Sequence, residues 1–191
     1  ISGCEKGKQW ERACLLLFEL PRRGVKVDVI HFNAAISACG KFRRWRDALR
    51  LLRLMGRFGV RPTVISYSAV ISACERQRQW ETASELLEEM SELQLGPDEV
   101  ALNACVAACE SASQWSRALA LLLSAPGRGL GISAQGCNAA VSACVKGREW
   151  ERAMMLLATA LREVEGFQPT IVCFNSVLLR PDARQWGAAL C

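Results

Sequence analysis

The fold is decided by a short motif, SACERQRQWETA at residues 72–83, because this motif recurs along the chain. Residues 142–153 read SACVKGREWERA, and residues 2–13 read SGCEKGKQWERA. The motif cysteine also returns where the rest of the motif differs, and it stands at positions 4, 39, 74, 109 and 144, always 35 residues apart. A constant period of this length is the signature of a repeat protein.

Tryptophan gives the same period independently of cysteine. The first five tryptophans follow one another at intervals of 35 residues, and the last stands 36 residues after the fifth. They are Trp10, Trp45, Trp80, Trp115, Trp150 and Trp186. Each begins a stripe of apolar residues, so we expect the tryptophan column to lie in the core.

Each repeat contains two stretches with the apolar spacing of a helix. In the first stretch, which begins at Val29, apolar residues stand three or four apart. A polar turn at residues 40–44 separates it from the second stretch, whose stripe begins at Trp45 and continues with period 3.6. Gly59 and Pro62 then end the second helix, because glycine suits a helix terminus and proline prevents continuation. In the fourth unit the residues 124–127, SAPG, are expected to end the second helix early.

Two such helices cannot bury an apolar face alone, so successive pairs must stack. The sequence therefore predicts an all-α fold, an α-solenoid in which antiparallel helix pairs form a right-handed superhelix. The units of this single array are 1–28 (partial), 29–63, 64–98, 99–133, 134–170 and 171–191 (partial). Both ends fall within a helix and neither has a polar capping repeat, so we expect the chain to be part of a longer array.

Composition excludes several classes of site. A single histidine, His31, excludes most histidine-dependent catalysis, and we interpret it as a surface group. The ten cysteines follow the repeat, and neighbouring repeats stand about 8–10 Å apart, beyond the reach of a disulfide. We therefore expect reduced cysteines that pack, no metal and no cofactor. The longest uncharged stretch, 129–145, is too short and too polar to span a membrane.

The helix pair of 35 residues resembles the pentatricopeptide repeat family. The resemblance rests on an aromatic residue followed by Asn near the start of the unit and a Gly-x-x-Pro-Asp/Thr segment at its end, and it covers the whole chain. Tetratricopeptide repeats also form helical solenoids, but their period is 34 and they begin Trp-x-x-Leu-Gly-x-x-Tyr. Neither feature occurs here.

The resemblance implies binding of single-stranded RNA, one base per repeat through two or three side chains. It places base recognition at the fifth and the last residue of each unit, with the second residue wedged against the base. The fifth residues are Asn33, Ser68, Asn103, Asn138 and Asn175, and the last residues are Asp28, Thr63, Asp98, Ser133 and Thr170. The wedge residues are Ile30, Ile65, Val100, Gln135 and Val172. By the family's code, units two to five prefer pyrimidine-G-C-pyrimidine.

Basic residues form a further column two positions after the repeated cysteine, interrupted by Ser111. Its members, which we call the cation column, are Lys6, Lys41, Arg76 and Lys146. In the family this column faces the RNA backbone, where cations neutralise phosphates. An acidic run on the second helix of unit three, residues 81–92, is expected to face solvent away from the RNA.

The same residues also have ordinary structural interpretations. Asn is a common helix cap, Asp and Thr are common after a turn proline, and cations favour helix ends. For any one unit these interpretations are as good as base recognition, but both columns recur together in four complete units, which favours recognition. 

Two other classes of function remain open. The main alternative is a helical-repeat scaffold that binds a protein or peptide, although such arrays usually present long side chains where this chain has short polar ones. An attached enzyme is the other, but the His-x-Glu and Pro-Cys-x-x-Cys motifs of zinc deaminases are missing from these residues, so we expect no enzymatic activity here. The resemblance points to RNA processing, stability, editing or translation in a mitochondrion or plastid, with possible protein partners through flanking parts of the array.

Overall fold

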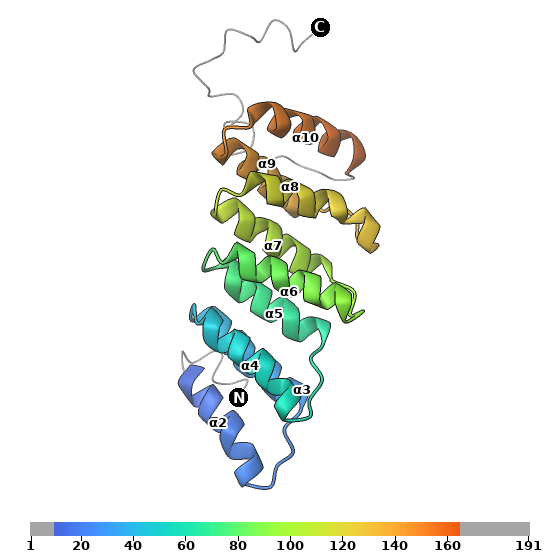
Figure 1. Cartoon of the computed structure of the whole chain (residues 1–191). Coiled ribbons are helices and arrows are strands. Elements are labelled where there is room, and N and C mark those ends of the chain that lie inside the picture. Colours follow the sequence, from blue (N-terminus) through green and yellow to red (C-terminus); the bar gives the residue numbers. More distant parts are fainter. Residues whose placement is uncertain (1–9, 165–191) are drawn as a thin grey trace, which may run out of the picture.

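The structure is a computed structural model, and it describes residues 10–164 apart from the side chain of Glu163. Helices make up this part of the chain, connected by short turns, and they form consecutive antiparallel pairs stacked in one direction (Figure 1). The helices are α2 (Trp10–Arg22), α3 (Val29–Lys41), α4 (Trp45–Arg57), α5 (Val64–Glu75), α6 (Trp80–Glu92), α7 (Glu99–Ser111), α8 (Trp115–Ser124), α9 (Ala134–Lys146) and α10 (Trp150–Glu163). The expected all-α solenoid is confirmed.

The first helices of the units form a continuous inner row. In this row, α3, α5, α7 and α9 pack directly on one another, and each also packs on its own second helix and on the preceding one. The second helices α4, α6, α8 and α10 form an outer row, in which no two neighbours pack backbone against backbone within residues 10–164. Because the inner row is the more closely spaced, the array curves with its inner row on the concave side.

Small residues allow the inner helices to approach closely. Gly40 is buried inside α3, and a Cβ atom added there would lie 3.2 Å from the Cβ of Ala73 on α5. The sequence placed Gly40 at the start of a polar turn, and this was wrong by two residues, since α3 continues to Lys41. The second helix of the fourth unit ends early, as expected. This helix, α8, stops at Ser124, and the short 3-10 helix η1 (Pro126–Arg128) follows it.

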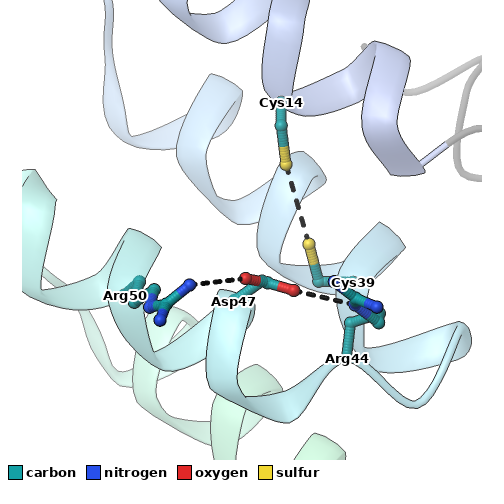
Figure 2. A network of polar contacts seen from close by, with 5 residues as sticks. All are labelled: Cys14, Cys39, Arg44, Asp47 and Arg50. Carbon is teal, nitrogen blue, oxygen red and sulfur yellow. Dashed lines mark hydrogen bonds and ion pairs between the residues drawn. The ribbon is translucent and has the colours of Figure 1, made fainter.

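The repeated cysteines pack in the core of the inner row. Cys39, Cys74, Cys109 and Cys144 are all fully buried, and burial raises the pKa of the Cys74 thiol to about 12. Cys39 is in contact with a second thiol, since the Sγ of Cys14 on α2 lies 3.8 Å from the Sγ of Cys39 on α3 (Figure 2). That distance is a contact between two thiols, because a disulfide bond is about 2 Å long. Cys4 lies outside the described residues.

The tryptophans lie at the margin of the core, so the prediction of a core column was right only in part: Trp10, Trp45, Trp80 and Trp115 pack against the core without being fully buried. Trp45, Trp80 and Trp115 are half-buried, and Trp150 is 40% exposed. Each stands at the first residue of a second helix, at the edge of the core, and the ring of Trp115 also covers the turn between α9 and α10 of the next unit. Trp115 lies so close to Gly147 that a Cβ added to the glycine would stand 2.2 Å from the ring.

Arginines complete the packing of two of these rings. The guanidinium of Arg44 lies 4.3 Å from the ring centroid of Trp10, and that of Arg152 lies 4.4 Å from the ring centroid of Trp115. Arg44 also donates to Asp47 over 2.8 Å, and Arg50 contacts the same carboxylate (Figure 2). These contacts tie the start of a second helix to the neighbouring unit.

Candidate nucleic-acid interface

In units one to four the last residue is the N-cap of the first helix of the next unit. Asp28, Thr63, Asp98 and Ser133 have the extended backbone of an N-cap before α3, α5, α7 and α9. The Oδ1 of Asp98 accepts a hydrogen bond from the backbone N–H of Ala101 over 2.8 Å, and the Oγ of Ser133 accepts one from Gly136 over 3.0 Å. Short side chains with an oxygen satisfy the free N–H groups of a helix start, which explains why the column contains only Asp, Ser and Thr.

Asp28 and His31 form a reciprocal cap at the start of α3. Asp28 accepts from the backbone N–H of His31 over 3.0 Å, and the Nδ1 of His31 accepts from the backbone N–H of Asp28 over 3.3 Å. The N–H of His31 lowers the pKa of the Asp28 carboxyl below its usual value. His31 is half-buried and forms part of this helix cap. The sequence-based interpretation of His31 as a surface group missed this capping role.

In unit three the fifth and the last residue are joined directly. The Oγ of Ser68 on α5 lies 2.9 Å from the Oδ1 of Asp98 and 2.9 Å from the carbonyl oxygen of Val64. Both neighbours are acceptors, so the single hydroxyl proton of Ser68 is donated within the protein. What the pair can offer to a ligand is oxygen lone pairs, from the hydroxyl and from the carboxylate.

In unit four the hydrogen bond between the two columns runs the other way. The Oγ of Ser133 donates to the Oδ1 of Asn103 over 2.7 Å. The amide oxygen of Asn103 is thus occupied, and its NH2 group has only a long contact of 3.5 Å to Glu99. Gly136 allows this arrangement, because a Cβ at that position would stand 2.9 Å from the same Asn103 oxygen.

In unit two the two columns are joined through a third side chain. Ser66 donates its hydroxyl proton to the Oδ1 of Asn33 over 2.7 Å. The same Oγ accepts from the backbone N–H of Thr63 over 3.1 Å and lies 3.2 Å from the Thr63 hydroxyl. The role of Ser66 was missed because it belongs to neither column, although its position, three residues after an N-cap, is one where reciprocal caps form.

The wedge residues form an exposed apolar row on the inner helices. Ile30 is 67% exposed, Ile65 66% and Val100 59%, and Gln135 is also exposed at the same place on α9. Each stands three residues before the fifth residue of its unit, on the same helix. Asn138 lies half-buried on α9 and has an interaction partner. Thr170, Val172 and Asn175 lie outside the described residues.

The cation column is only partly available to a ligand. The Nζ of Lys146 lies 3.0 Å from the Oε1 of Glu110, which also accepts from Ser142 over 2.7 Å. Arg76 is exposed and contacts the carbonyl of Gly40 over 3.5 Å, while Lys41 is exposed at the last residue of α3. Lys6 lies outside the described residues.

The acidic run of α6 lies on the outer row, and part of it is paired. Glu88 binds Arg117 over 2.9 Å, while Glu89 binds both Arg53 and the hydroxyl of Tyr67. Among residues 10–164, no three side chains of His, Cys, Asp or Glu are grouped so as to hold a metal ion. No helix in the same range is long and apolar enough to span a bilayer.

Two family models match the sequence. The model described as pentatricopeptide repeat domain matches residues 15–77, and the model described as PPR repeat matches residues 65–95. No curated protein matches this sequence significantly.

Several solved structures are similar over most of the chain. The pentatricopeptide repeat protein PPR10 from maize is 26% identical with a TM-score of 0.71, over 91% of this chain and 25% of its own length. PPR10 in complex with an 18-nt psaJ RNA element is 27% identical with a TM-score of 0.73, over 92% of this chain and 26% of its own. This chain thus spans about a quarter of the length of PPR10.

A more distant structure has the same fold. The PPR domain of Arabidopsis thaliana protein-only RNase P 1, in complex with tRNA, is 13% identical with a TM-score of 0.76 over 91% of both chains. The repeat of 35 residues, the stacked helix pairs and the matching models agree, and the chain belongs to the pentatricopeptide repeat family.

Proposed function

We propose that this chain binds single-stranded RNA along its inner row and recognises one base per repeat. The observation that carries the proposal is the direct hydrogen bond between the fifth and the last residue in units three and four, together with the link between these two columns through Ser66 in unit two. Each pair lies beside an exposed aliphatic side chain of the wedge column. A polar pair next to an apolar surface suits a nucleobase, which has hydrogen-bonding edges and flat apolar faces. The RNA bound by PPR10 supports this assignment.

The wedge column supplies the apolar part of the site. Ile30, Ile65 and Val100 recur every 35 residues on one face. Isolated exposed apolar residues are common, but a regular row of them marks a binding surface. Bases can be held between such side chains without regard to sequence, because every base has a flat face.

Unit three is suited to guanine. Ser68 and Asp98 offer only oxygen lone pairs to a ligand, since the hydroxyl proton is donated within the protein. The Watson–Crick edge of guanine presents two adjacent donors, the ring N1–H and the exocyclic amino group, which match two acceptors. Cytosine presents acceptors at the corresponding positions and would face these oxygens unfavourably.

Unit four is suited to cytosine. The amide oxygen of Asn103 is engaged by Ser133, so the group left for a ligand is the NH2 donor. The ring nitrogen and carbonyl of cytosine are acceptors that such a donor can bind. Unit two resembles unit four, because Ser66 engages the amide oxygen of Asn33, and it favours a pyrimidine. With unit five the preference becomes pyrimidine-G-C-pyrimidine, in the 5′ to 3′ direction.

In this proposal the chain positions RNA and does no chemistry on it. Binding of this kind serves RNA processing, stability, editing or translation, and we propose a mitochondrion or plastid as the compartment. Both points follow from the family and need their own tests, such as localisation of the tagged protein.

Selection from a random single-stranded RNA pool tests the proposal. The chain should enrich RNA with adjacent G and C, and a Ser68→Asn variant that keeps Asp98 should shift the first of these from guanine towards uracil. Ser72→Asn makes the same change one turn further along α5 and should leave the preference as it was.

Two results would count against base recognition. RNA enriched without preference at the two central positions would leave a basic scaffold, and binding to a peptide but not to RNA would favour the protein-binding alternative. Each recognised base is expected to contribute about 1–3 kcal/mol, so a real preference is easily measured.

A further inference from the structure

Each repeat contains two turns that require a left-handed residue, and the chain fills them differently. The turns that follow the second helices use glycine, at Gly24, Gly59 and Gly129 with φ between +68° and +74°, and Gln94 takes the equivalent place after α6. The turns that follow the first helices contain no left-handed glycine within residues 10–164. Their left-handed residues are Arg43 (φ 59°), Arg78 (φ 57°), Ser113 (φ 58°) and Arg148 (φ 63°).

Arginine is an unfavourable choice for this conformation. The Cβ atom of an ordinary residue is crowded when φ is positive, whereas glycine has no such cost. The turns after the second helices mostly use glycine for the left-handed residue, whereas three of the turns after the first helices use arginine. Non-glycine residues held in the left-handed region concentrate at functional sites, so a reason for the arginines is to be sought in a ligand.

The three arginines are exposed, and within residues 10–164 none of them forms an ion pair. No carboxylate partner occurs for Arg43, Arg78 or Arg148 among the described residues. Cations close to them are engaged, since Arg44 binds Asp47 over 2.8 Å and Lys146 binds Glu110 over 3.0 Å. The charges of these arginines are therefore free to meet an anion from outside.

The arginines follow the cation column from unit to unit. Lys41 is accompanied by Arg43, Arg76 by Arg78 and Lys146 by Arg148, always two residues later. In unit four both positions become serine, Ser111 and Ser113. The two columns are thus basic in the same units and neutral in the same unit. This shared pattern suits a single ligand that carries an anionic group at each repeat of the array.

We propose that Arg43, Arg78 and Arg148, the arginine ladder, bind the phosphate backbone of the RNA, with a gap at unit four. The inference rests on the proposed function. The ladder lies along the edge formed by the α3–α4, α5–α6 and α9–α10 turns, at the left in Figure 1. About 12 Å of helix separates Asn33 from Lys41 at 1.5 Å per residue, so bases are recognised at one end of the inner helices and phosphates are held at the other. Such contacts fix position and carry no sequence information.

Replacing the ladder by glycine separates binding from folding. In the triple variant R43G/R78G/R148G each glycine keeps the left-handed turn, so the Tm should not fall, while affinity for a fluorescent random-sequence single-stranded RNA should fall at least about 20-fold at 50 mM salt. Each phosphate contact contributes about 0.7 to the slope of log affinity against log salt. The slope should therefore become shallower by about 2, and the advantage of the wild type should shrink about 20-fold between 50 and 200 mM salt.

Three matched variants complete the experiment. Gln94→Gly relieves the same backbone conformation at the other edge and should leave RNA affinity unchanged. Arg→Lys at the three ladder positions keeps the charges and should keep the salt slope. Ser113→Arg fills the gap and should steepen the slope by about 0.7.

The outcomes distinguish the ladder from the function on which it rests. If the wild type binds RNA and the triple glycine variant has the same affinity and salt slope, the ladder is wrong and RNA binding stands. If the triple variant loses affinity together with Tm, the arginines are structural and the ladder is again wrong. If the wild type does not bind single-stranded RNA at all, both proposals fall.

Discussion

Units three and four bring the same two columns together but use the hydrogen bond in opposite directions. Ser68 donates to Asp98, so unit three presents acceptors, whereas Ser133 donates to Asn103, so unit four presents a donor. The difference arises from both residues of the pair, because the carboxylate of Asp98 and the amide oxygen of Asn103 can only accept, whereas the hydroxyl groups of Ser68 and Ser133 can donate. The last residue is also the cap of the next repeat. Base preference in one repeat is therefore coupled to the folding of the repeat after it.

Exchanging the pairs should have the largest effect. The double variant S68N/D98S gives unit three the side chains of unit four, and the preference at that position should change from guanine to cytosine. We expect discrimination of about 1–3 kcal/mol, which is roughly 5- to 150-fold in affinity, measured with RNAs that differ at one base. The reciprocal variant N103S/S133D should change unit four from cytosine to guanine. An unchanged preference in both would mean that the pairs do not recognise bases.

Removing either cap should have an intermediate effect on stability. Asp98→Ala leaves the N–H of Ala101 without its partner, and Ser133→Ala does the same to Gly136. Each should lower the free energy of unfolding by about 1 kcal/mol, measured by urea denaturation. Asp98→Asn retains a capping oxygen and serves as the control, with a smaller loss. If Asp98→Ala were as stable as the wild type, the coupling between neighbouring repeats would have no energetic basis.

The turn that ends α6 should gain stability from glycine. Unit three carries Gln94 in the left-handed region with φ 56°, where unit four carries Gly129. Gln94→Gly should raise the free energy of unfolding by about 0.5–1 kcal/mol, because the strain at Cβ disappears. Gly129→Gln, the reverse change in unit four, should lower it by a similar amount. Equal stability of both variants and the wild type would contradict this explanation.

The smallest effect is expected at equivalent glutamates of the two units. Burial raises the pKa of Glu75 in unit three, so its neutral form is favoured in the folded protein. Its contribution to stability is present below the unfolded pKa and is lost as the pH rises through the folded pKa. At neutral pH Glu75→Gln should therefore raise the free energy of unfolding, by less than about 0.5 kcal/mol.

Glu110 in unit four should respond with the opposite sign. It pairs with Lys146 over 3.0 Å, so Glu110→Gln should lower the free energy of unfolding by less than about 1 kcal/mol. Urea denaturation of both variants at neutral pH measures the contrast. The same sign for both substitutions would show that their surroundings are alike.

Periodicity was enough to predict the array, because local sequence sets the helices and their ends. The start of α4 at Trp45 and the early end of α8 at Ser124 both follow from residues within a few positions. The partial exposure of the tryptophans could not be predicted from local sequence. A helical stripe places Trp45 with the buried residues, but its position at the turn edge depends on how one unit sits on the next.

The candidate site was predictable as a set of columns and not as a set of contacts. The columns placed Ser68 and Asp98 in the right phase, but whether their side chains meet depends on the relative orientation of elements 30 residues apart in the chain. Ser66 and His31 were missed because they belong to neither column, and Glu110, which holds Lys146, stands on the preceding unit. Contacts between units require the superhelical geometry, which no single repeat encodes.

The unequal packing of the two rows has a mechanical consequence. The inner row is held by continuous apolar contact, while neighbouring outer helices are connected by exposed ion pairs such as Arg53–Glu89 and Arg117–Glu88. Exposed ion pairs contribute little and are weakened by salt. Bending that changes the spacing of the outer helices is therefore softer than stretching of the inner row. The array should therefore bend more easily than it stretches along its concave surface. Such bending changes the pitch of the superhelix and would let it match the spacing of an extended RNA strand.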